Sequence, residues 1–203
     1  MPPKAKFTRK EIIDAAFQLA REKGLEAVVA REVGKRLGTS SSPIFTAFRN
    51  MEELHTEVKK AAMKKFETYV QDALNYSPVF KYVGLRMIRF AIEEPKLFQI
   101  LYMQQHQENQ TYEDLMDELG PTMLACLDYL KKEYELSDQE AYQLFRQVWL
   151  QTFAVCILLA GKVCNFEQDE ISEILSINFQ GTLMLIKSGK YVDIQISPSD
   201  LDR

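Results

Sequence analysis

Four consecutive short hydroxyl side chains, at residues 39–42, are the feature of this 203-residue chain whose type and spacing most suggest binding chemistry. Hydroxyl groups of this kind bind phosphate oxygens and base edges. Arg31 precedes the cluster and Arg49 follows it, which adds positive charge on both sides. A purely structural role, the capping of a following helix, would use one hydroxyl group and leave the other three unexplained.

The charge distribution along the chain also favours a polyanionic partner. Residues 1–50 contain ten Lys and Arg against five Asp and Glu, a net charge of +5, whereas residues 51–203 contain fifteen against twenty-four, a net charge of −9. An acidic protein with one basic end is typical of a body that carries a polyanion-binding head. Basic termini are also common in proteins that bind no polyanion, so the motif inside the basic segment has to decide between the two interpretations.

That motif is a pair of short helices joined by a tight turn. A capping box formed by Thr8 and Glu11 predicts a helix over about residues 8–23, which Gly24 ends. A two-turn helix follows from Ala30, and its Gly34 would allow a close approach of two backbones. Gly38 tolerates the positive φ angle that the turn requires. This layout predicts a helix-turn-helix unit.

The second helix of such a unit places its N-terminal residues in the major groove of DNA. Ser40 and Ser42 both qualify as its N-cap, and Pro43 suits the first helical turn in either case. Thr46 and Arg49 then follow on the exposed side. A long helix opens at Asn50 and connects this head to the remainder of the chain.

Residues 8–54, TRKEIIDAAFQLAREKGLEAVVAREVGKRLGTSSSPIFTAFRNMEEL, resemble the DNA-binding head of the tetracycline-repressor (TetR) family of bacterial transcriptional regulators. The resemblance implies a sequence-specific DNA-binding regulator, expected to be a repressor that a small-molecule effector releases from a palindromic operator. The expected DNA-contacting residues are Arg31, Thr39, Ser40, Ser41, Ser42, Pro43, Phe45, Thr46, Arg49 and Met51, with Lys4, Lys6 and Arg9 of the N-terminal arm.

Two of these positions depart from the family pattern. Phe45 stands where the family usually has a tyrosine that contacts a phosphate, and Met51 stands where a lysine usually does so. Val28 and Val29 replace common hydroxyl residues as well. Losing these contacts removes affinity that does not depend on DNA sequence, although the N-terminus of the helix after Asn50 still offers backbone N–H groups to a phosphate.

The remainder of the chain predicts a helical bundle, which makes the protein all-α with about nine helices. The expected domains are a DNA-binding domain at residues 1–50 and an effector-binding and dimerisation domain at 51–203, with the linking helix starting at about 51. Helices are expected at about 78–93, 96–104, 112–134 with a kink at Gly120 and Pro121, from the capping box at Ser137 to about 163, and 168–187.

The last two helices are apolar on more than one face, so each needs two packing partners. In the resembled family these helices form a four-helix dimer interface, and two-fold symmetry would place two recognition helices about 34 Å apart on DNA. A monomer with these helices central in its core is the alternative. The expected interface residues are Phe153, Ile157, Leu158, Ile174, Ile177 and Leu185.

An effector site requires apolar walls with a few convergent polar groups. Aromatic and methionine side chains are abundant between residues 80 and 153, although such sets more often form ordinary core. The expected pocket residues are Phe98, Tyr102, His106, Tyr112, Met116, Met123, Trp149 and Phe153. The identity of the effector does not follow from the resemblance.

An enzyme is the principal alternative class, but the sequence contains no recognisable catalytic motif, so no catalytic residue, cofactor or metal is expected. An interaction protein that keeps the fold and binds DNA weakly is the second alternative, because of Phe45 and Met51. Three cysteines in apolar contexts are expected to be buried thiols. With no signal peptide and no apolar run long enough to span a membrane, we expect a cytoplasmic protein.

Overall fold

The computed structural model describes residues 7–104, 111–117 and 119–189, and over these ranges the chain is all-α, as predicted, with ten α-helices and no strand. One helix more than expected is present, because residues 112–134 form two helices. The elements are α1 (Arg9–Lys23), the 3-10 helix η1 (Leu25–Ala27), α2 (Ala30–Arg36), α3 (Ser42–Ala47), α4 (Met51–Ala73), α5 (Val79–Glu93), α6 (Pro95–Tyr102), α7 (Tyr112–Asp117), α8 (Pro121–Tyr134), α9 (Asp138–Ala160) and α10 (Gln168–Ser188).

Three of the predicted helix starts agree with the observed caps. Thr8 and Ser137 each form a complete capping box with the glutamate three residues later. Asn50 caps α4 by accepting a hydrogen bond from the Glu53 N–H at 2.9 Å. Each cap satisfies backbone donors that the first turn leaves without partners, which fixes where the helix begins.

The expected kink at Gly120 and Pro121 is instead a complete break between α7 and α8. Gly120 has a φ of 47° and a ψ of −121°, outside the helical region, and Pro121 begins the new helix. Proline lacks the N–H that would continue the helix ladder and suits the first turn of a new helix. A glycine with positive φ before a proline therefore ends one helix and starts another.

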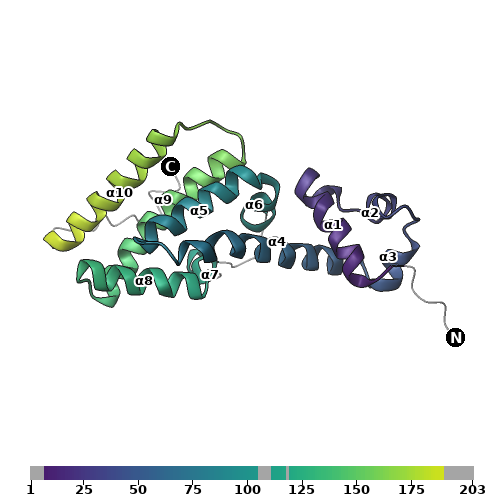
Figure 1. Ribbon diagram of the computed structural model, residues 1–203, viewed down its shortest axis with the longest axis horizontal. Helices are drawn as coiled ribbons and strands as arrows, with labels where there is room; N and C mark the ends of the chain where they lie inside the picture. Colours follow the sequence, from purple (N-terminus) through teal and green to yellow (C-terminus); the bar gives the residue numbers. More distant parts are fainter. Residues whose placement is uncertain (1–6, 105–110, 118, 190–203) are drawn as a thin grey trace, which may run out of the picture.

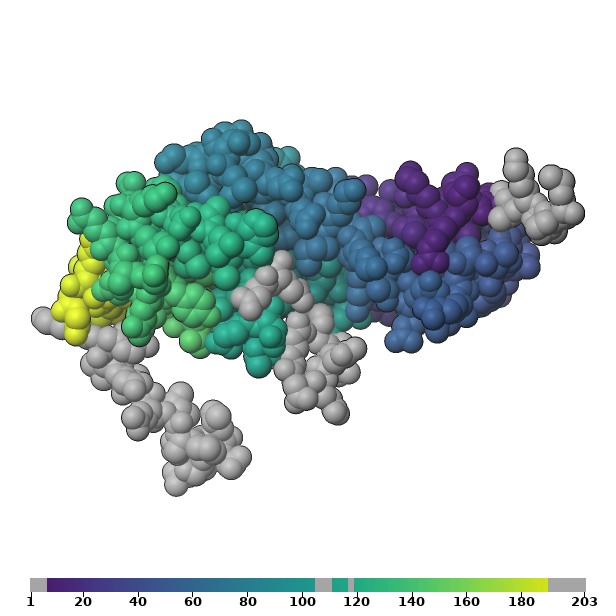
Figure 2. Space-filling view, turned by 90° about the horizontal axis from the view of Figure 1, so that it is seen from below, coloured from purple at the N-terminus to yellow at the C-terminus, as the bar shows by residue number. Residues whose placement is uncertain are grey.

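The molecule is elongated, with α1 to α3 at one end and the bundle of α5 to α10 at the other (Figure 1). We call the α1–α3 unit, residues 7–50, the head, and helices α4 to α10 the body. Helix α4 runs from the head into the body, where α5 packs between α4 and α9. The head and α10 lie at opposite ends in the space-filling view as well (Figure 2).

The body core contains most of the aromatic residues that were expected to line an effector pocket. Phe98, Tyr102 and Phe153 pack with ring centroids 5.1–5.9 Å apart, and none is more than 8% exposed. Met116 is fully buried. These four side chains belong to the buried core, and none of them lines the cavity described below.

The other expected pocket residues have different positions. Tyr112 donates its hydroxyl hydrogen to the Arg146 carbonyl oxygen at 3.0 Å, and Met123 packs partly buried against the core. Trp149, 3% exposed, does line a cavity, which is described below. His106 lies outside the described residues.

Helix α10 packs on α9 and leaves an apolar face exposed. Ile177 is 64% exposed, Met184 72% and Leu185 50%. Ile157, Leu158 and Ile174 are partly buried. Phe153, expected at the dimer interface, is instead directed into the core of its own chain, which leaves only 8% of it exposed.

Within the described ranges α9 is the single helix with the length and apolar composition to cross a membrane, and half of its most apolar window is buried in the structure, as in a core helix. Cys126 and Cys156 are buried thiols as expected, and burial raises the pKa of Cys126 to about 12. Cys164 is exposed, because it lies in the loop after α9 rather than in a helix.

Candidate DNA-binding surface

The α2–turn–α3 segment has the geometry that the sequence predicts for a helix-turn-helix. After α2 the chain turns at Gly38, whose φ is 66°, and the Thr39 N–H donates to the Gly34 carbonyl oxygen at 2.9 Å. Val33 and Ile44 are fully buried and Phe48 is 2% exposed, so α2, which packs on α1, and α3, which packs on α2, share one small core. This core holds α3 with its opposite side facing outward.

Gly34 sits where the turn passes closest to α2. A Cβ atom at this position would lie 2.7 Å from the Ser40 carbonyl oxygen and 2.9 Å from the Ser40 carbonyl carbon. Both contacts are with backbone atoms, which cannot move away as a side chain can. The predicted close approach is thus confirmed and depends on glycine.

We expect Gly34→Ala to lower the free energy of unfolding by about 1–2 kcal/mol. The steric cost of forcing extra atoms into a packed site is about 1–3 kcal/mol, and the better helix propensity of alanine offsets up to about 1 kcal/mol of it. Urea denaturation followed by circular dichroism measures the change. The matched control is Gly84→Ala in α5, where the new Cβ would meet the Thr152 side chain at 3.7 Å, an ordinary contact. If Gly34→Ala and Gly84→Ala raise the free energy of unfolding equally, the turn next to Gly34 is not sterically constrained.

The exposed side of α3 carries the hydroxyl cluster. Ser40, Ser42 and Thr46 are exposed, and Thr39, Ser41 and Pro43 are partly exposed. Thr46 donates its hydroxyl hydrogen to the Ser42 carbonyl oxygen at 3.1 Å, which leaves its oxygen able to accept. Phe45, 55% exposed, lies on the same helix. The hydroxyl groups expected to bind DNA therefore share one accessible surface.

The N-cap of α3 is Ser41, which differs from both expected candidates. Its side chain makes no capping hydrogen bond, whereas Ser40 Oγ accepts from the Ser42 N–H at 3.4 Å. Ser42 and Pro43 are the first two residues of the helix. The proline lacks an N–H, so the short helix has one donor fewer to satisfy at its start.

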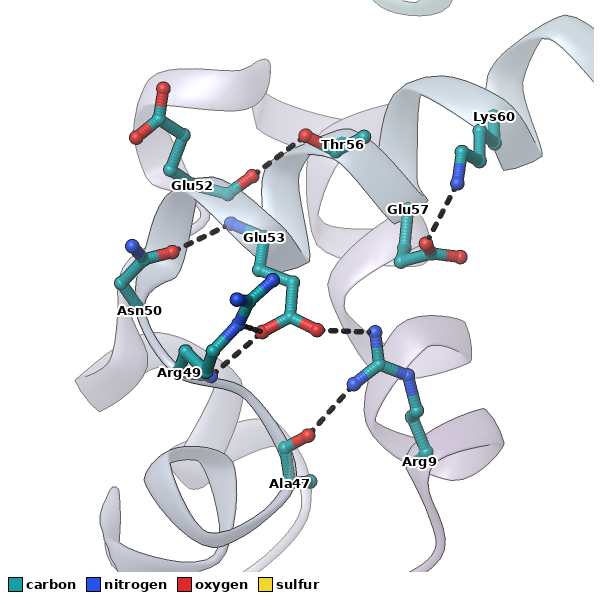
Figure 3. Close-up of polar contacts among 9 residues, drawn as sticks. All are labelled: Arg9, Ala47, Arg49, Asn50, Glu52, Glu53, Thr56, Glu57 and Lys60. Carbon is teal, nitrogen blue, oxygen red and sulfur yellow. Dashed lines mark hydrogen bonds and ion pairs between the residues drawn. The ribbon is translucent and has the colours of Figure 1, made fainter.

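A glutamate that the sequence analysis did not single out organises the basic residues of this surface (Figure 3). Glu53 accepts from the Arg49 N–H at 2.8 Å and forms an ion pair with Arg9 at 2.9 Å. The hydrogen bond from the Arg49 backbone is the largest cause of the lowered pKa of Glu53, and the Arg9 side chain adds to it. Arg9 also donates to the Ala47 carbonyl oxygen at 2.8 Å and lies 4.1 Å over the Phe48 ring.

Arg9 is therefore a clamp between the start of α1, the end of α3 and the first turn of α4. The sequence analysis treated it as part of a DNA-contacting arm; the structure gives it intramolecular partners instead. The spacing between Arg9 and Glu53, forty-four residues, gives no sequence signal for this pairing. Lys4 and Lys6 lie outside the described residues.

The remaining basic candidates are accessible. The Arg49 side chain is 91% exposed and reaches Glu53 with its Nε at 3.5 Å. Arg31 is exposed and has no ion-pair partner among the described residues. Met51 is partly buried against the core at the start of α4. Arg31 and Arg49 are thus the head arginines best placed to meet an anion.

Two short helices at a glycine turn, with the second helix exposing its polar face, define a helix-turn-helix DNA-binding protein. Residues 12–58 match the family model described as bacterial regulatory proteins, tetR family. The chain therefore carries a TetR-family N-terminal helix-turn-helix domain at residues 12–58. A search among curated proteins found no similar sequence. Regulators of the matched family are not enzymes.

Proposed function

We propose that the protein is a dimeric transcriptional repressor that binds a palindromic operator through α3 and leaves it when a small molecule binds the body. The observation that carries the proposal is the exposed hydroxyl face of α3, which packs on a buried core, with the exposed Arg31 before it and Arg49 after it in the sequence. Hydroxyl groups at the start of a recognition helix reach base edges, and arginines beside it reach phosphates.

The proposal divides the chain into a DNA-binding domain at residues 1–50 and an effector-binding and dimerisation domain at residues 51–203. The net charge of +5 on the first fifty residues suits a polyanion, and the exposed apolar face of α10 suits a symmetric partner. A two-fold dimer would present two copies of α3 to a palindrome. The same proposal places the protein in the bacterial cytoplasm, with its operator.

The test compares two kinds of variant on DNA fragments that include the region flanking the protein's own gene. A triple variant that combines Ser41→Ala, Ser42→Ala and Thr46→Ala should bind the operator about 100-fold more weakly or worse. Each substitution removes a neutral hydrogen bond to DNA, and a dimer loses each of these bonds twice. The slope of log K against log salt should not change, since no charge is lost. Arg31→Ala with Arg49→Ala should instead flatten that slope.

Thr68→Ala is the control, because Thr68 is an exposed α4 hydroxyl group that donates within its own helix, to the Lys65 carbonyl oxygen. Its operator affinity should equal that of the unmodified protein. An unchanged affinity in the triple α3 variant would contradict the proposal. That result would favour an interaction protein that keeps the fold.

The alternative of weak DNA binding has one structural argument in its favour. Glu52, Glu53 and Glu57 line a shallow groove at the start of α4, beside the surface that should face phosphates. Two basic side chains, Arg9 and Arg49, pair with Glu53, and Lys60 pairs with Glu57 at 3.0 Å. This pairing offsets most of the negative charge, and we therefore favour the regulator.

A further inference from the structure

A cavity of about 210 Å³ lies in the body between α5, α8, α9 and α10. It is separate from the aromatic cluster of Phe98 and Phe153, and Trp149 is the one residue it shares with the pocket expected from the sequence. Its walls are predominantly apolar, and aromatic side chains come from all four helices. Phe80 of α5, for example, lies 5.9 Å from Phe145 of α9 and 5.8 Å from Phe179 of α10, measured between ring centroids.

Trp149 lines the cavity and carries a buried N–H group. Its side chain stacks on Phe145 at 5.9 Å, the residue is 3% exposed, and its Nε1 has no hydrogen-bond partner among the described residues. Burying an N–H group without an acceptor is unfavourable, so a molecule that supplies an acceptor here would gain affinity from it. Thr152, one turn further along α9, donates its own hydroxyl hydrogen to the Val148 carbonyl oxygen at 2.9 Å.

The size and charge of the cavity limit the occupant. An engineered apolar cavity of about 150 Å³ holds benzene, and sites for drug-sized molecules start at about 300 Å³. A volume of 210 Å³ therefore suits one ring or two fused rings. Lys81 is the single Lys, Arg, Asp or Glu among the described lining residues, so no carboxylate is present to pair with a cationic ligand.

We propose that this cavity binds a one- or two-ring aromatic molecule that is not a cation and whose carbonyl or ether oxygen accepts a hydrogen bond from Trp149 Nε1. Binding itself does not depend on DNA; only the regulatory consequence, a shift of α9 and α10 against α5, rests on the proposed function. The proposed ligand binding and the proposed regulatory function can therefore be contradicted separately.

Trp149 is the single tryptophan in the chain, so its fluorescence reports directly on the cavity. The probes are three bicyclic molecules of similar shape: 1-indanone, which has an acceptor oxygen, indane, which has none, and 2-aminoindane, which is a cation at pH 7. We expect saturable change with 1-indanone, about tenfold weaker binding of indane, equivalent to about 1.4 kcal/mol, and no saturable change with 2-aminoindane. No saturable change with 1-indanone, or equal affinity for indane, would overturn the proposal.

Two variants complete the test, with binding measured by calorimetry so that no tryptophan is needed. Trp149→Phe keeps an aromatic ring against Phe145 and removes the donor, so it should bind 1-indanone about tenfold more weakly and indane unchanged. Tyr142→Phe on the same helix, outside the cavity lining, is the matched control and should bind both as the unmodified protein does. Loss of indane binding together with 1-indanone binding in a folded Trp149→Phe protein would contradict the role of the donor.

Discussion

Arg21→Ala is expected to lower the free energy of unfolding by about 3 kcal/mol, because it leaves a buried carboxylate without its cation. Arg21 of α1 donates to both oxygens of Glu94, from Nε at 2.6 Å and from an Nη at 2.5 Å. The Glu94 side chain is 2% exposed and lies between α5 and α6. Arg21 is 43% exposed, which places the expected loss at the lower end of the range for a broken buried pair.

The matched control for this pair is Arg36→Ala. Arg36 also makes two hydrogen bonds to one glutamate, Glu22 of α1, at 2.8 and 2.7 Å, but the two side chains are 35% and 50% exposed. An exposed pair contributes about 1 kcal/mol at most, so this variant should lose far less stability. Urea denaturation of both variants measures the difference.

A double variant separates the ion pair from simple loss of packing. Glu94→Gln combined with Arg21→Ala removes the buried charge, so the double variant should be more stable than Arg21→Ala alone. If the double variant is instead as unstable as the sum of both single variants, the pair contributes through packing and not through charge.

The Arg21–Glu94 pair also links the head to the body. Arg21 belongs to the helix that supports α2 and α3, while Glu94 immediately precedes α6. Helix α1 packs against both α4 and α6, and Gln104 donates to Glu26 across the same junction at 3.4 Å. A movement of α6 would therefore be transmitted to the head through a charged contact as well as through α4.

The head could be predicted from the sequence in more detail than the body, for a physical reason. Its determinants are local: the Thr8 capping box, the close approach at Gly34 and the positive φ at Gly38 each depend on residues within a few positions. Signals of this kind are visible in the spacing of residue types. The match over residues 12–58 includes Gly34 and Gly38 and begins directly after the Thr8 capping box.

The contacts that the sequence analysis missed join residues far apart in the chain. Arg9 pairs with Glu53 across forty-four positions, and Arg21 with Glu94 across seventy-three. An exposed arginine that binds DNA and one that clamps two helices look the same in a sequence. The pocket prediction meets the same limit, because aromatic residues on amphipathic helices do not reveal whether they pack on each other, as Phe98 and Phe153 do, or enclose space, as Trp149 does.

Replacing two residues on the exposed face of α10, Ile177→Asp with Met184→Asp, is expected to convert the proposed dimer into a monomer. The two positions are seven residues apart, two helical turns, so they lie on the same side of α10. Ile177 is 64% exposed and Met184 72% exposed, so these side chains contribute little to the fold of their own chain. In a two-fold interface each new carboxylate occurs twice, and desolvated like charges cost several kcal/mol.

The expected result is a monomer in sedimentation equilibrium, with an unchanged helical circular dichroism spectrum and an operator affinity at least about 100-fold weaker, because only one half-site is bound at a time. Leu124→Asp is the matched control: Leu124 is 61% exposed on a different helix, α8, and the variant should remain a dimer. A doubly substituted protein that stays dimeric and keeps full operator affinity would place the dimer contact elsewhere. The apolar face of α10 would then require a different partner, because an exposed stripe of this kind on a regulator has no role in its own core.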